Sequence, residues 1–100
     1  MHKQMVSKQK RVLNSLMNSG LLLVDSVFPV EKRTVFGLGG EDSDLVISLE
    51  WRDGGGCQWV ADFTGDNLHA ATVADNRIKL ADSYGEAVCV DFFDLKPGKF

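Results

Sequence analysis

The sequence predicts an α+β protein in which one N-terminal amphipathic helix packs on an antiparallel meander sheet of about five to six strands. Residues 5–18 repeat apolar side chains at helical spacing, whereas the chain from Leu21 onward consists of short β-rich runs separated by turn residues. A chain of 100 residues can bury one hydrophobic core but not two. We therefore expect a single domain over residues 1–100.

The helix is expected over residues 5–19. Its apolar residues occupy one arc of a helical wheel, with polar and basic residues on the other side. The apolar arc contains Met5, Val6, Val12, Leu13, Leu16 and Met17. Gly20 stands where a helix commonly ends. The apolar arc should face the core, and the basic face is either solvated or in contact with nucleic acid or a membrane surface.

The β-rich runs alternate with Gly, Pro, Asn and Asp, which is typical of a meander rather than of βαβ units. Pro29 is expected to end the first strand, because proline cannot donate to a ladder of hydrogen bonds. No second helix of useful length is predicted, and the tail 96–100 should fray. The expected strands cover residues 21–28, 34–38, 45–51, 57–63, 68–73, 77–82 and 86–93.

The clearest hairpin joins residues 45–51 to residues 57–63 across a glycine-rich loop. Placing Trp51 opposite Cys57 puts Leu49 opposite Trp59, and every residue on that face is then apolar. A slip by one residue would destroy this agreement, so the face is well specified. Both tryptophans should be largely buried beneath the helix.

The second hairpin joins residues 77–82 to residues 86–92 across Ser83-Tyr84-Gly85. Gly85 can supply the positive φ that such a loop needs. Leu80 should face Val88, and Arg77 should pair with Asp91 as an exposed ion pair. The turn before Arg77 has either two or three residues, and this choice decides whether Ala71 or Ala70 points inward.

Charge is distributed unevenly along the chain. Residues 1–33 carry six basic and two acidic residues, whereas residues 34–95 carry three basic and twelve acidic residues. The simpler interpretation is that these charges keep the protein soluble and complement one another within the fold. The alternative is a sheet surface suited to a basic partner.

Cys57 and Cys89 are the only cysteines, and no C-x-x-C motif or neighbouring histidine pair accompanies them. We expect two free thiols and a reducing, cytoplasmic compartment. Polar residues interrupt the apolar run 12–24 and no small-x-small cleavage site follows, so a signal peptide is not expected. The run 20–24 is too short to span a membrane.

No catalytic residue, metal ligand or cofactor site is predicted. Residues 37–40 are glycine-rich, but no P-loop lysine and no helix follow them. Residues 62–67 place oxygen ligands around a glycine, yet without the spacing of an EF-hand loop, which favours a turn. His2 and His69 have no nucleophile with which to form a catalytic pair.

The remaining candidate site is an acidic surface around the first hairpin. Such a surface can dock on a cationic surface of another protein and imitate the phosphate charge of a nucleic acid. The candidate partner-binding residues are Glu41, Asp42, Asp44, Glu50, Asp53, Asp62 and Asp66. We therefore expect a non-enzymatic inhibitor that blocks a basic, nucleic-acid-binding surface of a partner protein.

In size, acidity and lack of catalytic machinery, the chain resembles the small inhibitors of phages and mobile elements, including anti-restriction and anti-CRISPR proteins, and immunity proteins that neutralise toxins. The main alternative is a nucleic-acid-binding regulator that acts through Lys3, Lys8, Lys10 and Arg11 on the helix. A structural subunit of a larger assembly is a third interpretation. A membrane partner is not expected, and homodimerisation stays open.

Overall fold

The computed structural model describes residues 7–94, which form two helices and seven strands. In chain order these are α1 (Lys8–Asn18), β1 (Leu21–Val24), β2 (Phe28–Val35), β3 (Leu45–Arg52), β4 (Gln58–Thr64), α2 (Gly65–Ala70), β5 (Thr72–Ala74), β6 (Arg77–Ala81) and β7 (Ala87–Phe93). The α+β class and the N-terminal helix are confirmed. The expected number of strands was too low, because the sheet has seven.

Helix α1 begins after Ser7, whose hydroxyl accepts a hydrogen bond from the backbone N–H of Lys10 at 3.1 Å. Its buried residues are Val12, Leu13 and Leu16, as the apolar arc predicts. The predicted helical residues Met5 and Val6, like the predicted tail 96–100, lie outside the described residues.

Arg33 of β2 fastens the other end of α1, since its guanidinium donates to the carbonyls of Leu16, Met17 and Ser19. A cation is favourable at this end because helical carbonyls there lack partners. Partial burial of the guanidinium lowers the pKa of Arg33 from its usual value.

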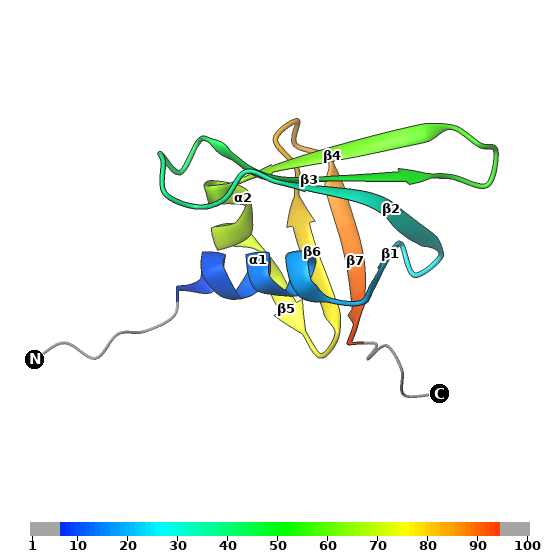
Figure 1. The fold of residues 1–100 in the computed structure, drawn as a ribbon, viewed down its shortest axis with the longest axis horizontal. Helices are drawn as coiled ribbons and strands as arrows, with labels where there is room; N and C mark the ends of the chain where they lie inside the picture. Colours follow the sequence, from blue (N-terminus) through cyan, green and yellow to red (C-terminus); the bar gives the residue numbers. More distant parts are fainter. Residues whose placement is uncertain (1–6, 95–100) are drawn as a thin grey trace, which may run out of the picture.

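All neighbouring strands are antiparallel, in the order β4-β3-β2-β1-β7-β6-β5. Strand β2 belongs to both halves of this sheet: Phe28 and Pro29 pair with β1, whereas Val30 and residues 32–35 pair with β3. The ladder with β3 itself has a register shift between Val30 and Lys32. Figure 1 shows that β3 and β4 cross β6 and β7 steeply, and the core fills the angle between the halves.

Pro29 lies inside β2 rather than ending a strand. Strand β1 stops at Val24, a turn with positive φ at Asp25 and Ser26 follows, and β2 starts at Phe28. Pairing with β3 begins only at Val30, so the missing N–H of Pro29 costs no hydrogen bond on that side. The expected strands 21–28 and 34–38 are therefore replaced by β1 and β2.

The β3–β4 hairpin has the predicted buried face but a register that differs by two residues. Trp51 lies opposite Trp59, not Cys57, and Leu49 lies opposite Ala61. Cys57 belongs to the loop, because the Asp53 carboxylate accepts hydrogen bonds from the N–H groups of Gly55 and Cys57 at 2.9 and 3.0 Å. A shift by two leaves every side chain on its own face.

At its other end β3 carries an irregularity between Leu45 and Ile47 that turns Val46 inward. Leu45, which alternation predicts to be buried, is therefore exposed. On the face predicted to be solvated, Ser48 is buried and donates a hydrogen bond to Asp62.

The predicted strand 68–73 is wrong in its first half, because residues 65–70 form α2. Thr64 caps this helix: its hydroxyl accepts from the N–H of Asn67 at 3.2 Å, and the Asn67 side chain accepts from the N–H of Thr64 at 2.8 Å. Leu68 and Ala71 are buried in the core. The segment 62–67, interpreted as a turn, is therefore the end of β4 followed directly by the first residues of α2.

The β6–β7 hairpin has the predicted register, with Leu80 opposite Val88 and Arg77 opposite Asp91, and Gly85 has a φ of 85°. The preceding turn has two residues, since Ala74 pairs with Arg77. This settles the open alternative, with Ala71 buried and Ala70 exposed.

Candidate functional site: an acidic, aromatic hollow

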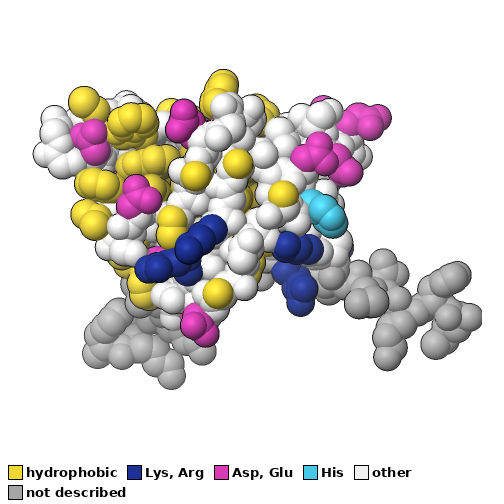
Figure 2. Space-filling model, turned by 180° about the vertical axis from the view of Figure 1, so that it is seen from behind, with side chains coloured by type: hydrophobic (Ala, Val, Ile, Leu, Met, Phe, Trp, Pro, Cys, Tyr) yellow, Lys and Arg dark blue, Asp and Glu magenta, His cyan; other side chains and the backbone are white. Residues whose placement is uncertain are grey.

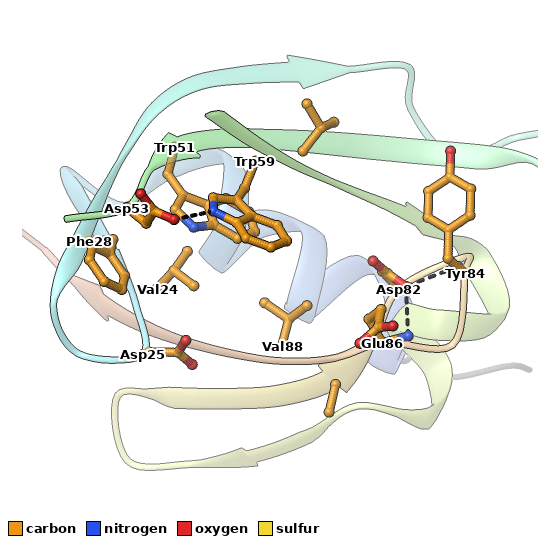
Figure 3. Close-up of a pocket in the computed structure, with 12 residues that line it drawn as sticks. Val24, Asp25, Phe28, Trp51, Asp53, Trp59, Asp82, Tyr84, Glu86 and Val88 are labelled. Carbon is orange, nitrogen blue, oxygen red and sulfur yellow. Dashed lines mark hydrogen bonds between the residues drawn. The ribbon is translucent and has the colours of Figure 1, made fainter. Parts of the chain in front are cut away.

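A hollow of about 670 Å³ opens between the two halves of the sheet. No residue of α1 or α2 lines it, because both helices cover other parts of the core. Figure 3 shows side chains from β1, β3, β4 and β7 pointing into this space. Its lining residues are Val24, Asp25, Phe28, Trp51, Asp53, Trp59, Val60, Asp82, Tyr84, Glu86, Ala87 and Val88. A partly apolar concavity of this size is typical of a binding site.

Two tryptophans form the aromatic wall of the hollow. Trp51 and Trp59 lie opposite each other on β3 and β4, but Trp51 is 8% exposed and Trp59 is 52% exposed. The expectation that both are buried is therefore wrong for Trp59. Helix α1 has 11 residues, which span about 16 Å, and the β3–β4 hairpin extends beyond it (Figure 1).

The exposed indole of Trp59 is held in one orientation. Its Nε1 donates a hydrogen bond of 2.9 Å to Oδ2 of Asp53, drawn in Figure 3. This bond, together with the N–H groups of Cys57, Gly55 and Gly56, holds the pKa of Asp53 below its usual value. Asp53 consequently keeps its negative charge at neutral pH beside the aromatic wall.

Among residues 7–94, four carboxylates line the hollow and no lysine or arginine does. They belong to Asp25 in the β1–β2 turn, Asp53 in the β3–β4 loop, and Asp82 and Glu86 in the β6–β7 turn. Asp82 accepts hydrogen bonds from the N–H groups of Tyr84 and Glu86, each at 2.9 Å. Like charges around an apolar concavity raise the local concentration of a cationic ligand.

Asp62 fastens the β6–β7 turn to β4. Its carbonyl accepts from the N–H of Ser83 at 2.7 Å, and its carboxylate accepts from the Tyr84 hydroxyl at 3.2 Å. The second bond raises the pKa of the Tyr84 hydroxyl. These contacts close one end of the hollow and place the exposed ring of Tyr84 at its rim.

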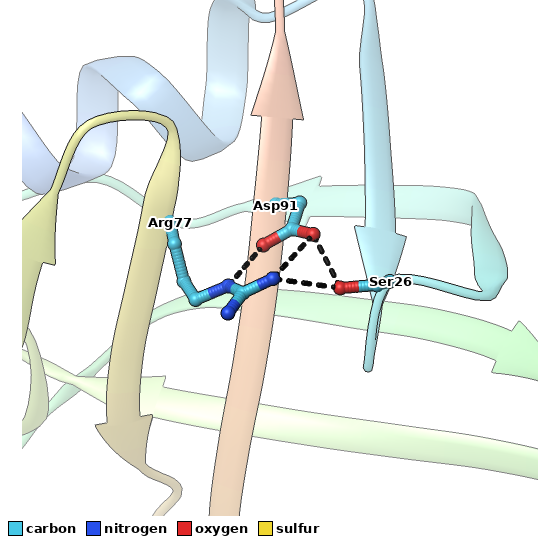
Figure 4. A network of polar contacts seen from close by, with 3 residues as sticks. All are labelled: Ser26, Arg77 and Asp91. Atoms are coloured by element: carbon cyan, nitrogen blue, oxygen red, sulfur yellow. Dashed lines mark hydrogen bonds and ion pairs between the residues drawn. The ribbon is translucent and has the colours of Figure 1, made fainter.

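The β1–β2 turn that carries Asp25 is braced from outside the hollow. The Asp91 carboxylate accepts hydrogen bonds from Arg77, at 2.8 Å from Nε, and from the Ser26 hydroxyl. Arg77 also donates to Ser26 at 3.0 Å, which completes the network in Figure 4. The bonds from Arg77 and then Ser26 lower the pKa of Asp91. The predicted pair of Arg77 and Asp91 is present, but Asp91 is buried.

The seven carboxylates predicted as one surface lie in three places. Glu41, Asp42, Asp44 and Asp66 gather where the loop before β3 meets α2, with the N–H of Asp66 donating to the carbonyl of Asp42 at 2.9 Å. Gln9 donates to the Asp42 carboxylate at 3.2 Å, so this loop is joined to α1 as well.

Glu50 and Asp62 share the outer face of the hairpin, as predicted, but they are not directly opposite each other. Glu50 pairs with Val60, and Asp62 pairs with Ser48. Glu50 accepts a hydrogen bond from Gln58 at 2.9 Å and lies 4.0 Å from the Lys32 ammonium. Of the seven predicted residues, Asp53 is the one that lines the hollow.

Sequence reasoning missed the contributions of Asp25, Asp82 and Glu86 to this site. A signal was available in one of the turns. The segment Asp82-Ser83-Tyr84-Gly85-Glu86 places an aromatic residue between two carboxylates in a loop, where the core does not need an aromatic side chain. Figure 2 shows hydrophobic side chains, with carboxylates among them, over the end of the molecule that carries the β3–β4 hairpin.

The alternative basic site lies apart from the hollow. Lys8, Lys10 and Arg11 are exposed on α1, and none of them forms an ion pair with another described residue. Lys8 and Arg11 line a second hollow of about 580 Å³ that reaches Thr72 and Val73 of β5. Lys3 lies outside the described residues.

Cys57 is exposed in the hairpin loop, Cys89 is half-buried on β7, and both are free thiols. Within residues 7–94, no group of three His, Cys, Asp or Glu side chains is arranged to hold a metal ion. No helix in that range combines the length and apolarity needed to cross a membrane.

The arrangement therefore offers aromatic faces and fixed negative charge for binding. Comparison of the chain with protein-family models, with curated proteins and with solved protein structures finds no match.

Proposed function

We propose that this protein is a non-enzymatic binding protein that receives a basic, partly apolar segment of a partner protein in the hollow. The observation that supports this most directly is that, within the part of the chain that the structure describes, an exposed indole at Trp59 is combined with four lining carboxylates and no lining cation. A ligand that supplied cationic side chains on apolar stems would satisfy both features.

Arginine and lysine match this chemistry in two ways. Their charged groups are attracted to the faces of aromatic rings, and their methylene stems cover apolar surface. Buried aromatic residues, moreover, commonly contribute most of the free energy of a protein interface. Trp51 would form the floor of such an interface and Trp59 its wall.

Inhibition is the extension of this proposal that the charge distribution favours. A partner whose basic residues normally contact nucleic acid would lose access to its substrate when those residues enter the hollow. Complementary charge would also speed association and make it sensitive to salt. The carboxylates of Glu50 and Asp62, on the outer face of the same hairpin, would add to that attraction.

The proposal is tested with a short synthetic peptide of alternating arginine and valine, using the fluorescence of Trp59 as the signal. The double variant Asp25→Asn and Glu86→Gln removes two lining charges whose side chains make no hydrogen bond to another described residue. We expect binding to weaken about tenfold at low salt, since two exposed charge–charge contacts of up to about 1 kcal/mol each together reach about the 1.4 kcal/mol that corresponds to a factor of ten, and we expect the difference to shrink at high salt.

The matched control is Glu41→Gln with Asp66→Asn, which removes the same amount of charge at the α2 end of the molecule. This control should bind the peptide as wild type does. Equal affinity of the hollow variant and wild type, or equal weakening in both double variants, would refute a site in the hollow.

The regulator acting through α1 makes the opposite prediction. Reversing Lys8 and Arg11 to glutamate would abolish retention on a short DNA duplex while the hollow variant retained it. Because Lys8, Lys10 and Arg11 are exposed, this alternative is tested alongside the hollow with the same set of variants.

A further inference from the structure

We infer that the basic segment binds as an extended strand added to the free edge of β4, with alternate side chains entering the hollow. This inference rests on the proposed function and specifies how the partner is held. Strand addition supplies affinity through main-chain hydrogen bonds, and pockets for alternate side chains supply specificity.

Strand β4 is one of the two outermost strands of the sheet and, among the strands of residues 7–94, pairs with β3 alone. Gln58, Trp59 and Val60 are all exposed. Protein edges are usually protected by charge, proline, a bulge or a cover, and residues 58–61 carry none of the first three. The other edge strand, β5, has three residues, and Thr72 and Val73 share a hollow with residues of α1.

The direction of the free backbone groups follows from the hairpin. The N–H of Asp53 donates to the carbonyl of Cys57 at 3.0 Å, so these residues form a hydrogen-bonded pair. Such pairs alternate along an antiparallel ladder, which directs the N–H and C=O groups of Gln58, Val60 and Asp62 away from β3.

The backbone of Asp62 already forms a hydrogen bond on this outer side of β4. Its carbonyl, which has the same direction as that of Val60, already accepts the N–H of Ser83 at 2.7 Å. The backbone groups of Gln58 and Val60 have no hydrogen-bond partner among the described residues. The open edge therefore extends from the hairpin loop to the Ser83 contact, about 14 Å for four residues.

An added strand would place alternate side chains on the two faces of β4. Those on the side of Trp59 would enter the hollow and meet its indole and the carboxylate of Asp53. Those on the other side would lie beside Val60, with Glu50 opposite it on β3. The carboxylate of Glu50 already contacts Gln58 and Lys32, so this edge favours a segment with arginine or lysine at alternate positions, directed into the hollow, and apolar residues between them.

A second copy of this chain is disfavoured as the occupant. In a two-fold symmetric pair the two β4 edges would run antiparallel, which would bring Asp62 of each copy toward the loop that carries Asp53 of the other, and like charges brought together are destabilising. The occupant that complements this edge is therefore a basic segment of another protein.

The test uses the arginine–valine peptide in three forms: unmodified, N-methylated at every odd residue, and N-methylated at every even residue. N-methylation removes the N–H donors but keeps the charge and the apolar side chains. In an added strand, only every second N–H group of the peptide points toward β4. Methylation of that set should weaken binding at least about tenfold relative to methylation of the other set. Equal binding of all three forms would overturn strand addition and leave the proposed function intact.

A protein variant supplies the second arm. Val60→Pro removes one outward N–H without touching the ladder to β3, whereas Val60→Ala retains it. The proline variant should therefore bind the unmodified peptide about tenfold more weakly than the alanine variant, because both lose the valine side chain and only the proline variant lacks the donor. In the wild-type complex, the amide protons of Gln58 and Val60 should become protected from hydrogen exchange.

Two results with the Val60 variants would overturn the inference. One is equal affinity of both variants when their amide spectra show a native fold. The other is a concentration-dependent dimer, seen in sedimentation without peptide, that Val60→Pro abolishes, since a second copy would then occupy the edge. Failure of the unmodified peptide to bind wild type at all would refute the proposed function itself.

Discussion

Trp51 and Trp59 face each other across two strands, yet they should contribute very differently to stability. Trp51 is almost fully buried, whereas about half of Trp59 is open to solvent. Alternation along a strand identifies the face on which a residue lies, but not how far along that face the cover extends. Alternation alone therefore predicted burial for both residues, whereas only Trp51 lies where the rest of the core covers the sheet.

This difference gives a prediction for alanine substitutions. Trp51→Ala should cost about 3 to 5 kcal/mol, because it removes a large side chain from the core. Trp59→Ala should cost about 1 kcal/mol, because it removes a half-exposed side chain together with its hydrogen bond to Asp53. Denaturant unfolding measures both.

If Trp51→Ala fails to fold, Trp59→Phe keeps the prediction testable. The remaining emission should then come from Trp51 alone and shift to shorter wavelength, because that indole is shielded from water. A spectrum unchanged from wild type would contradict the assigned exposures.

At the level of elements, the sequence predicts a structure well where one local pattern decides it. The β6–β7 hairpin was predicted in full register because its turn is short and contains a glycine at the left-handed position, Gly85. The β3–β4 register was wrong by two residues because the glycine-rich loop permits several closures. The side chain of Asp53 selects among them, and that interaction is invisible to alternation.

Helix α2 escaped prediction because its signal is a cap rather than a periodicity. With six residues, it is too short for an amphipathic pattern to appear. Thr64 and Asn67 form the reciprocal hydrogen bonds of a capping box, with asparagine in place of the usual glutamate or glutamine. A three-residue spacing of this kind was available in the sequence.

The cap should be measurable. Thr64→Ala removes the acceptor for the N–H of Asn67 and should destabilise the protein by about 1 kcal/mol. Thr72→Ala, at an exposed position on β5, is the control and should change the free energy of unfolding by less than about 0.5 kcal/mol. Similar losses in both variants, measured by urea unfolding, would count against the capping role.

For the whole molecule, sequence reasoning recovered the class and most of the core but not the candidate site. Buried positions such as Ile47, Leu49 and Phe63 follow from local alternation. The hollow instead depends on how three turns meet, at Asp25, Asp53 and Glu86, and no local pattern relates those turns. The acidic excess was recognised, but its distribution over three places required the fold.

Acid stability is a property of the whole molecule to which the network in Figure 4 should contribute. The pKa of Asp91 is lowered in the folded state. The contribution of Asp91 to the stability of the fold should therefore be complete above about pH 4, which is the ordinary pKa of an aspartate in an unfolded chain. It should be lost as the pH falls through the lower pKa that Asp91 has in the folded protein. Arg77→Gln should lower the melting temperature at pH 7, and this difference should narrow below pH 4.

Arg52→Gln is the matched control, since Arg52 lies 3.5 Å from Glu31 in a pair whose side chains are both 55% exposed. Exposed pairs contribute little, so its melting temperature should stay close to that of wild type at both pH values. A constant difference between Arg77→Gln and wild type across the pH range would assign the effect to packing rather than to the charge of Asp91.

Because β2 takes part in both halves of the sheet, the width of the hollow is governed at two points distant in the sequence. One is the step from Pro29 to Val30, where the ladder with β1 gives way to the ladder with β3. The other is the contact between Asp62 and the β6–β7 turn. A change of backbone geometry between Pro29 and Val30 would thus be transmitted to the binding space by rotation of one half of the sheet against the other, with the Asp62 contact resisting the opening.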